Sequence, residues 1–336
     1  MIFSEYHSLQ ALNTFHLDAR ARYFVEAHSE SDLRAAFLAG IRPLLILGSG
    51  SNILITKNFE GLVVRNAIAG KAIIEETPDY VIISAGAGEN WHDFVLWALE
   101  HNFGGIENLS LIPGTVGAAP IQNIGAYGVE LKDVFHSLEA MDIDTGIVST
   151  FSYEDCRFGY RDSIFKNECK GRYCITRVTF QLTTANHRIN TAYGAIRDTL
   201  QQQGILQPTI QDVSRAVIAI RSSKLPDPTQ LGNAGSFFKN PEIPAAQFAD
   251  LQQLFPNIVS FPSAIGYVKV PAGWLIEQCG WKGFRRGDAG CYDKQALVLV
   301  NYGHATGADI WQLALAIADS VEAKFGIRLN PEVNVI

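Results

Sequence analysis

The sequence predicts an α+β protein of two or three parts, and three observations support this. Short β-rich runs dominate the first half of the chain. From about residue 193 onward, apolar residues recur mainly at helical spacing. A Leu-Pro-Asp-Pro segment at 225–228 must end a helix, because proline cannot continue the hydrogen-bond ladder. The 336 residues suffice for about two domains of roughly 150 residues each, so we expect a domain boundary at 225.

The elements of the first half follow from local pattern. Strands are predicted at 43–47, 61–67, 71–76, 79–86 and 173–184, where β-branched and apolar residues cluster. A helix is predicted at 30–40 behind a cap at Ser29 or Ser31, and a second helix follows Asn90. Two β-like runs joined around Asp144-Thr145-Gly146 predict a hairpin.

The second half contains more helices than strands. Helices are predicted at 193–204, 209–224, 245–255, 272–280 and 308–326. A strand is predicted at 295–301, and the tail from Ile327 to Ile336 resembles a terminal strand. No internal repeat is present.

Composition excludes several functional classes. Hydrophobic residues make up 47% of the chain and charged residues 18%, which predicts a folded protein. A net charge of -7 argues against a non-specific partner of nucleic acid or of an acidic membrane. The start lacks a signal-peptide pattern and no window is long and apolar enough to span a membrane, so we expect a cytoplasmic protein.

Cysteines and histidines do not indicate a metal or disulfide site. The five cysteines include no C-x-x-C pair, and the eight histidines include no H-E-x-x-H motif. We therefore expect the cysteines to be buried small residues and expect no metal.

Two glycine-rich segments favour an anionic or flat ligand. Gly48-Ser49-Gly50-Ser51-Asn52 follows a predicted strand, and its small residues allow backbone amides to converge on a pyrophosphate. It lacks the third glycine and the following helix of a dinucleotide fingerprint, so the motif taken alone is more typical of an ordinary glycine-rich turn. The stretch 104–128 is rich in glycine and nearly free of charge, which suits either a ligand-lining backbone or a buried loop.

Several polar residues are candidates for ligand contact, although for each one taken singly a surface or capping role is the simpler explanation. Arg161 suits a carboxylate or phosphate, because guanidinium groups bind such anions through two hydrogen bonds. Ser236 stands in Gly-Ser-Phe-Phe and not in the G-x-S-x-G elbow of a serine nucleophile, which disfavours acyl transfer. The remaining candidates are Lys224, Asn240, Gln295, Tyr193 and Glu332. The residues alone indicate an α+β protein that binds a nucleotide-like anion.

Nine motifs in order resemble the UDP-N-acetylenolpyruvoylglucosamine reductase family. They are "LILGSGSNIL", "GAGENWHDFV", "IPGTVGAAPIQNIGAYG", "CRFGYRDSIFK", "RSSKLPDP", "GNAGSFFKNP", "AGWLIEQCG", "QALVLVN" and "NPEV". The resemblance implies a PCMH-type, vanillyl-alcohol-oxidase-like FAD-binding fold of two subdomains with a C-terminal α+β substrate-binding domain. The implied parts are 1–70 and 71–224 for FAD, 225–325 for substrate, and 326–336 as a strand returning to the first subdomain.

The resemblance also implies site residues. The catalytic residues would be Arg161, Ser236 as proton donor, and Glu332. The substrate-binding residues would be Tyr160, Tyr193, Lys224, Asn240 and Gln295. The residues holding FAD would be Gly48, Ser49, Gly50, Ser51, Asn52, Ile112, Pro113, Gly114, Gly117, Ala118, Gln122, Asn123, Gly125, Ala126 and Tyr127.

The implied reaction uses non-covalent FAD, NADPH and a UDP-sugar in a monomer. NADPH would reduce FAD, and reduced FAD would deliver hydride to the enolpyruvyl ether of UDP-N-acetylglucosamine enolpyruvate. The sequence differs from the family pattern in two places: "TVGAAP" carries alanines where relatives often have serines, and "AGCYDKQ" lacks a histidine found in some of them. A flavin-dependent alcohol oxidase and a non-catalytic nucleotide-sugar-binding protein remain alternatives.

Overall fold

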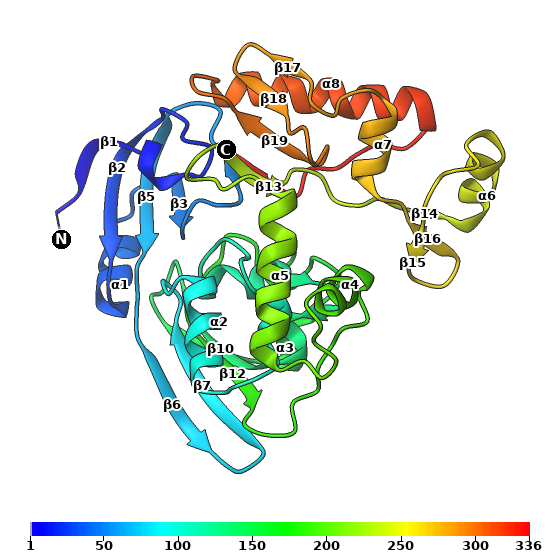
Figure 1. Cartoon of the computed structure of the whole chain (residues 1–336). Coiled ribbons are helices and arrows are strands. Elements are labelled where there is room, and N and C mark those ends of the chain that lie inside the picture. The colour runs from blue at the N-terminus through cyan, green and yellow to red at the C-terminus, as the bar shows by residue number, and fades with distance from the viewer. Residues whose placement is uncertain (1) are drawn as a thin grey trace. The chain divides into compact units, whose positions relative to one another are not determined.

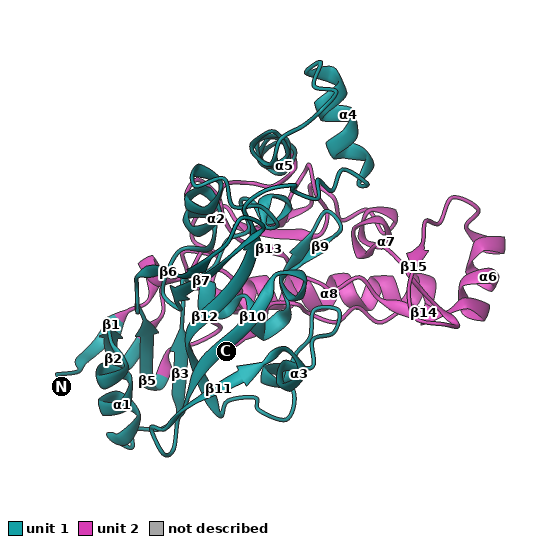
Figure 2. Cartoon of the chain, turned by 90° about the horizontal axis from the view of Figure 1, so that it is seen from below, with its two compact units in different colours: residues 1–7, 21–49, 60–223 teal, residues 8–20, 50–59, 224–336 magenta. Residues whose placement is uncertain are grey.

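The computed structural model describes residues 2–336, which form two compact units (Figure 2). The first unit comprises residues 1–7, 21–49 and 60–223, and the second comprises 8–20, 50–59 and 224–336. The long C-terminal part of the second unit begins at Lys224, next to the proline segment. Segments 8–20 and 50–59 group with this C-terminal part, although they lie within residues 1–70, which the resemblance assigns to the first FAD subdomain.

One sheet of the first unit is built mainly from N-terminal strands. Its order is β1 (Ser4–Ser8), β2 (Arg20–Ala27), β5 (Phe59–Asn66) and β3 (Leu44–Leu47). The strands β3 and β5 are parallel, with Leu45 opposite Val63. Helix α1 (Glu30–Leu38) starts at Ser29, whose hydroxyl accepts a hydrogen bond from the Asp32 amide. Of the two caps considered from sequence, Ser29 is therefore the correct one.

The second sheet of this unit is antiparallel (Figure 1). Buried side chains of its strands belong to the main hydrophobic core of the unit. Its order is β11 (Val148–Ser152), β10 (Phe135–Asp142), β12 (Tyr173–Thr183), β7 (Tyr80–Gly86) and β6 (Lys71–Glu76). Helix α2 (Trp91–Glu100) buries Trp91 and Phe94 against Phe180, with ring centroids 6.0 and 4.9 Å from that ring. Apolar burial on this scale dominates the stability of a domain.

Short elements and two helices complete the first unit. The short elements are η2 (Glu107–Leu109), η3 (Val116–Ala118), η4 (Pro120–Gln122), β8 (Gly125–Ala126), β9 (Val129–Glu130), η5 (Leu131–Asp133), α3 (Tyr153–Cys156) and η6 (Ile164–Lys166). Helices α4 (Gly194–Gln202) and α5 (Ile210–Lys224) contribute to one apolar cluster, formed by Ile196, Leu200, Val213 and Val217. Helix α5 ends just before Leu225-Pro226, as the proline pattern predicts.

The second unit also combines sheets and helices. One sheet has the order β13 (Gly232–Ser236), β19 (Val298–Asn301), β18 (Ala289–Cys291) and β17 (Arg285–Arg286). Helix α8 (Gly307–Phe325) lies along this sheet and contacts α7 (Ala272–Gln278) (Figure 1). A smaller sheet has the order β14 (Glu242–Pro244), β16 (Tyr267–Lys269) and β15 (Phe261–Pro262), next to α6 (Ala245–Leu254). The η1 turn (Gln10–Leu12) precedes a buried Asn13.

The end of the chain pairs with a strand near its beginning. Strand β20 (Asn334–Val335) is parallel to β4 (Ile53–Leu54), which lies within residues 1–70. The amide and hydroxyl of Thr56 both donate to the carbonyl oxygen of Ile336, at 2.8 Å each. The predicted terminal strand therefore exists, although only two of its residues have strand geometry.

Cys156, Cys174 and Cys291 are buried, as expected, whereas Cys169 and Cys279 are only half-buried. Burial raises the pKa values of the Cys156, Cys174 and Cys291 thiols to about 12. Within residues 2–336, no group of histidine, cysteine and acidic side chains has the arrangement of a metal site. Across the same residues, every helix is too short or too polar to cross a bilayer.

Candidate active site

The first glycine loop connects β3 to β4 and requires glycine at two positions. Gly50 has a φ of 67°, and a Cβ atom there would overlap the carbonyl oxygen of Leu12. A Cβ atom at Gly48 would lie 2.7 Å from Thr115 Oγ1. Gly48 therefore lets the chain pass close to Thr115, which lies within the second segment predicted to hold the cofactor.

That second segment, residues 112–128, is folded into short turns and exposes little charge. Asn123 is fully buried with a φ of 42°. Its amide group donates to the Gly159 carbonyl at 2.9 Å, and its Oδ1 accepts from the Lys132 amide at 3.0 Å. The side chain of Asn123, predicted from the resemblance to contact FAD, thus holds the segment against the turn that precedes Arg161.

Arg161 is held by the same segment. Its Nη2 atom donates to the Gly125 carbonyl oxygen at 2.6 Å, and its φ of 52° places it in the left-handed region. The guanidinium carbon lies 5.4 Å from the ring centre of Tyr160, whose side chain is exposed. The predicted catalytic arginine and the predicted cofactor segment therefore form one local structure.

Arg221 is a second cation in this region, and the sequence analysis missed it. It lies on α5, and its Nε atom donates to the Leu111 carbonyl at 3.1 Å. Burial lowers the pKa of Arg221, a hydrogen bond to Tyr127 raises it, and the charge of Arg161 lowers it. The helical spacing of Ser214, Val217 and Arg221 places this arginine on the buried face of α5, and that spacing was the available signal.

Tyr193 lies immediately before α4 and packs against the segment predicted to hold the cofactor. Its ring meets that of Tyr127 edge to face, with centroids 5.1 Å apart, while 48% of Tyr193 stays exposed. Burial raises the pKa of the Tyr127 hydroxyl. Asn108 donates to the carbonyls of Tyr127 and Asn190 at 3.1 and 3.0 Å. The first unit therefore gathers Tyr160, Arg161 and Tyr193 around residues 125–128.

Ser236 lies in the second unit, at the end of β13. Gly235 before it has a φ of 68°, and the pairing of β13 with β19 shifts register between Asn233 and Ser236. The Gly235 amide donates to Asn233 Oδ1 at 2.9 Å. This bulge leaves Ser236 exposed at the end of the ladder. Phe237 and Phe238, which follow, are core residues with 0% and 1% exposure.

Glu332 lies next to the Ser236 segment despite a separation of almost 100 residues. The Glu332 amide donates to the Phe237 carbonyl at 2.8 Å, and the Lys239 amide donates to the Asn330 carbonyl at 2.9 Å. Asn52 of the first glycine loop donates from Nδ2 to the Glu332 carbonyl at 3.4 Å. The backbone segments that carry Ser236, Glu332 and Asn52 therefore lie together in the second unit.

The side chains of Asn240 and Gln295 each lie next to one of the first two residues of α7. Asn240 Oδ1 accepts a hydrogen bond from the Ala272 amide at 2.9 Å. Gln295 Oε1 accepts from the Leu297 amide at 3.3 Å, and a Cβ atom at Gly273 would lie 3.0 Å from it. Both side-chain oxygens therefore accept hydrogen bonds from backbone amides of the protein itself. Lys224, the last residue of α5, is exposed.

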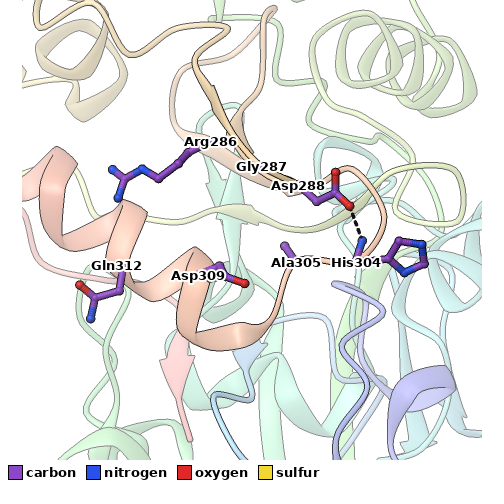
Figure 3. A pocket seen from close by; sticks show the side chains of 7 residues that line it. All are labelled: Arg286, Gly287, Asp288, His304, Ala305, Asp309 and Gln312. Atoms are coloured by element: carbon purple, nitrogen blue, oxygen red, sulfur yellow. Dashed lines mark hydrogen bonds between the residues drawn. The ribbon is translucent and has the colours of Figure 1, made fainter.

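A polar cavity of about 500 Å³ also occurs in the second unit (Figure 3). It is lined by Arg286, Gly287, Asp288, His304, Ala305, Asp309 and Gln312. Asp288 accepts from the His304 amide at 2.8 Å, and Asp309 completes the N-terminal cap of α8 with Thr306. None of the residues predicted from sequence lines this cavity.

The residues present fit FAD. The first loop offers small side chains and a glycine in the left-handed region, a combination that suits a pyrophosphate. Residues 112–128 offer backbone groups with few charges, and Arg161 and Arg221 supply positive charge beside them.

A family model agrees with this assignment, and a solved structure shares the fold. Residues 21–152 match the FAD binding domain, and residues 227–336 match the C-terminal domain of UDP-N-acetylenolpyruvoylglucosamine reductase. The crystal structure of that reductase from Thermus caldophilus covers 100% of this chain and 99% of its own, with a TM-score of 0.68 and 24% identity. The predicted fold class is therefore confirmed as a FAD-binding domain followed by a reductase C-terminal domain.

Sequence relatives extend over nearly the whole chain. The UDP-N-acetylenolpyruvoylglucosamine reductase of Pseudomonas aeruginosa is 53% identical over 334 residues, and that of Flavobacterium johnsoniae is 51% identical over 330 residues. Each match covers 98% of this chain and 98% of the relative. This chain belongs to the UDP-N-acetylenolpyruvoylglucosamine reductase family.

Proposed function

We propose that this chain uses NADPH and non-covalently bound FAD to reduce UDP-N-acetylglucosamine enolpyruvate to UDP-N-acetylmuramate. The observation that carries the residue assignment is the contact between the Ser236 and Glu332 segments, made by the Glu332 amide and the Phe237 carbonyl. FAD, when bound, supplies the hydride chemistry that no amino-acid side chain provides. The loops at Gly48–Asn52 and Ile112–Tyr127 are the proposed FAD contacts.

Ser236 is the proposed proton donor. Reduction of the enolpyruvyl double bond places negative charge on the carbon next to the carboxylate, and that carbon must then take a proton. Such a carbanion is a strong base, so a neutral hydroxyl within hydrogen-bond reach is an adequate acid. The bulge at Gly235 leaves Ser236 exposed at a strand end, which supports this role.

Arg161 is the proposed electrostatic stabiliser of that negative charge. Its guanidinium is already oriented by the 2.6 Å bond to the Gly125 carbonyl. A cation fixed before the reaction needs no reorganisation as charge develops, and this lowers the barrier. Glu332 is proposed to assist as a neutral hydrogen-bond donor, because an ionised carboxylate would repel the developing charge.

The remaining predicted residues are proposed to bind the substrate. Tyr160 and Tyr193 are exposed beside Arg161 and Tyr127, and Lys224 is an exposed cation suited to a diphosphate. Asn240 and Gln295 would use their amide nitrogens, because their oxygens accept backbone hydrogen bonds. We also propose that the protein is a cytoplasmic monomer that supplies a peptidoglycan precursor, which size-exclusion chromatography and cell fractionation would test.

The flavin spectrum provides the direct test of this function. Purified protein should be yellow, and NADPH should bleach it without oxygen. The enolpyruvyl substrate should then restore the colour, whereas a simple alcohol should not. Reoxidation by oxygen with alcohol turnover would instead indicate a flavin-dependent alcohol oxidase, and binding of the UDP-sugar without any colour change would indicate a non-catalytic binding protein.

A further inference from the structure

Leu111 has an unusual backbone conformation directly before the proposed cofactor segment. Its φ is 57°, in the left-handed region that residues with a Cβ atom seldom occupy. The following residues lead through Ile112 and Pro113 to Gly114, which also has a positive φ of 131°. Strained residues persist only where the surrounding structure holds them in place, and they concentrate at functional sites.

Two side chains from different helices hold Leu111. The Leu111 amide donates to Nδ1 of His92 on α2 at 3.0 Å, and the Leu111 carbonyl accepts from Nε of Arg221 on α5 at 3.1 Å. A residue with this backbone geometry cannot continue a helix or a strand, so its polar groups need such partners. His92 and Arg221 supply one partner each.

The chemistry of the two partners is complementary and not interchangeable. His92 accepts at Nδ1, so its ring is neutral and carries its proton on Nε2. Arg221 has only donors and suits the carbonyl. If the two side chains exchanged places, the amide of Leu111 would face a donor and lose its hydrogen bond.

Neighbouring contacts extend this support along the loop. The Trp91 indole donates to the Leu109 carbonyl at 2.9 Å, and the Trp91 amide donates to the Gly114 carbonyl at 3.1 Å. The Ser110 hydroxyl lies 2.8 Å from that of Ser214, and both residues are buried. The start of α2 and the buried face of α5 thus hold residues 109–114 from two sides.

We propose that His92 and Arg221 are positioning residues for FAD, because they stabilise the left-handed backbone of Leu111 and thereby set the path of residues 112–117. This inference rests on the proposed function, in which that segment contacts FAD. Neither side chain needs to touch the cofactor for this role. Loss of either hydrogen bond lets Leu111 relax toward an ordinary conformation and moves the loop that follows.

The experiment measures FAD affinity of the apoprotein by quenching of flavin fluorescence, and apoprotein stability by thermal unfolding. We expect His92→Leu to raise the Kd for FAD at least about tenfold. His92→Asn, whose Oδ1 retains an acceptor, should stay within about threefold of the wild type. His101→Leu removes an exposed histidine from the end of the same helix and serves as the matched control, with an unchanged Kd.

A second substitution separates positioning from simple loss of packing. Leu111→Gly removes the Cβ penalty of the left-handed conformation, so His92→Leu should cost much less affinity in the Leu111→Gly background than in the wild type. An equal cost in both backgrounds, or an unchanged Kd in His92→Leu, would overturn the inference. If the wild-type apoprotein binds no FAD at all, the proposed function itself fails.

Discussion

The Glu332 amide donates a 2.8 Å hydrogen bond to the carbonyl oxygen of Phe237. This bond holds Glu332 next to the residue that follows Ser236. The proposed proton donor and the proposed catalytic glutamate therefore lie on two segments that are joined by a main-chain hydrogen bond. Substitution of either side chain leaves that bond intact, because it joins main-chain atoms. The two roles can therefore be tested one at a time by mutation.

Ser236→Ala should leave reduction of the flavin by NADPH within about twofold of the wild-type rate. It should slow reoxidation by the enolpyruvyl substrate about 10²- to 10⁴-fold, the usual range for loss of a general acid. Stopped-flow absorbance measures both half-reactions separately. Ser149→Ala, an exposed serine on β11, is the control, and equal slowing of both half-reactions in Ser236→Ala would show a structural role.

Glu332→Gln should retain more activity than Glu332→Ala, by about tenfold in kcat. Glutamine keeps a hydrogen-bond donor of similar length, whereas alanine removes the group and leaves the backbone bond to Phe237 in place. Steady-state kinetics measures kcat of both variants and so tests whether a neutral hydrogen-bond donor suffices at this position. Equal losses would count against a neutral donor at this position.

Arg161→Lys should lower kcat/KM about 10²- to 10³-fold although it preserves the positive charge. A lysine ammonium cannot reproduce the planar guanidinium, whose fork of donors binds the Gly125 carbonyl and matches the geometry of a carboxylate. Arg157→Lys changes a nearby exposed arginine that pairs with Glu168, and it should have no comparable effect. Comparable losses in the two variants would point to a general charge effect.

Gly50→Ala should destabilise the protein more than Gly40→Ala, by about 2 kcal/mol or more. Both glycines have a φ near 70°, so both substitutions carry the left-handed penalty of about 1 kcal/mol. Only the Cβ at position 50 overlaps another atom, the Leu12 carbonyl oxygen, while position 40 has open space. Urea unfolding of the two variants measures the difference, and equal stabilities would mean that the loop moves freely to make room.

FAD affinity should fall as the pH drops through the pKa of His92, which lies below the ordinary histidine value. Burial lowers the pKa of His92, the nearby Asp93 raises it, and Arg221 lowers it. The neutral ring therefore prevails at pH 7, and a proton on Nδ1 at lower pH would abolish the bond to the Leu111 amide. The affinity should be fully present above the ordinary value of 6.5 and decline below the lowered value, as fluorescence titration across pH would show. The His92→Asn variant should remove this dependence, and an unchanged profile in that variant would exclude His92 as the titrating group.

Local sequence patterns predicted most of the regular structure because their signals are short-ranged. The helix caps at Ser29 and Asn90 and the proline stop after Lys224 each depend on neighbouring residues. Strand β13 was missed, since Gly232–Ser236 contains two glycines and no β-branched residue. Its pairing with β19 comes from tertiary structure instead.

The site was only partly predictable because it also depends on tertiary structure. The resemblance supplied Arg161, Ser236 and Glu332 as candidates, but the support around them depends on contacts between distant segments. Single residues such as His92 and Arg221 carry no motif of their own, and their significance appears only when both reach Leu111. Backbone strain at Leu111 is equally invisible in the sequence, because leucine normally signals nothing more than burial.

The pairing of β20 with β4 has a consequence for synthesis of the protein in the cell. Strand β4 leaves the ribosome long before its partner β20, because most of the chain lies between the two strands. Residues 50–59 therefore cannot complete their hydrogen bonds until Asn334 and Val335 have been made. A truncation that removes these two residues would leave β4 without its partner and would remove the strand that follows Glu332.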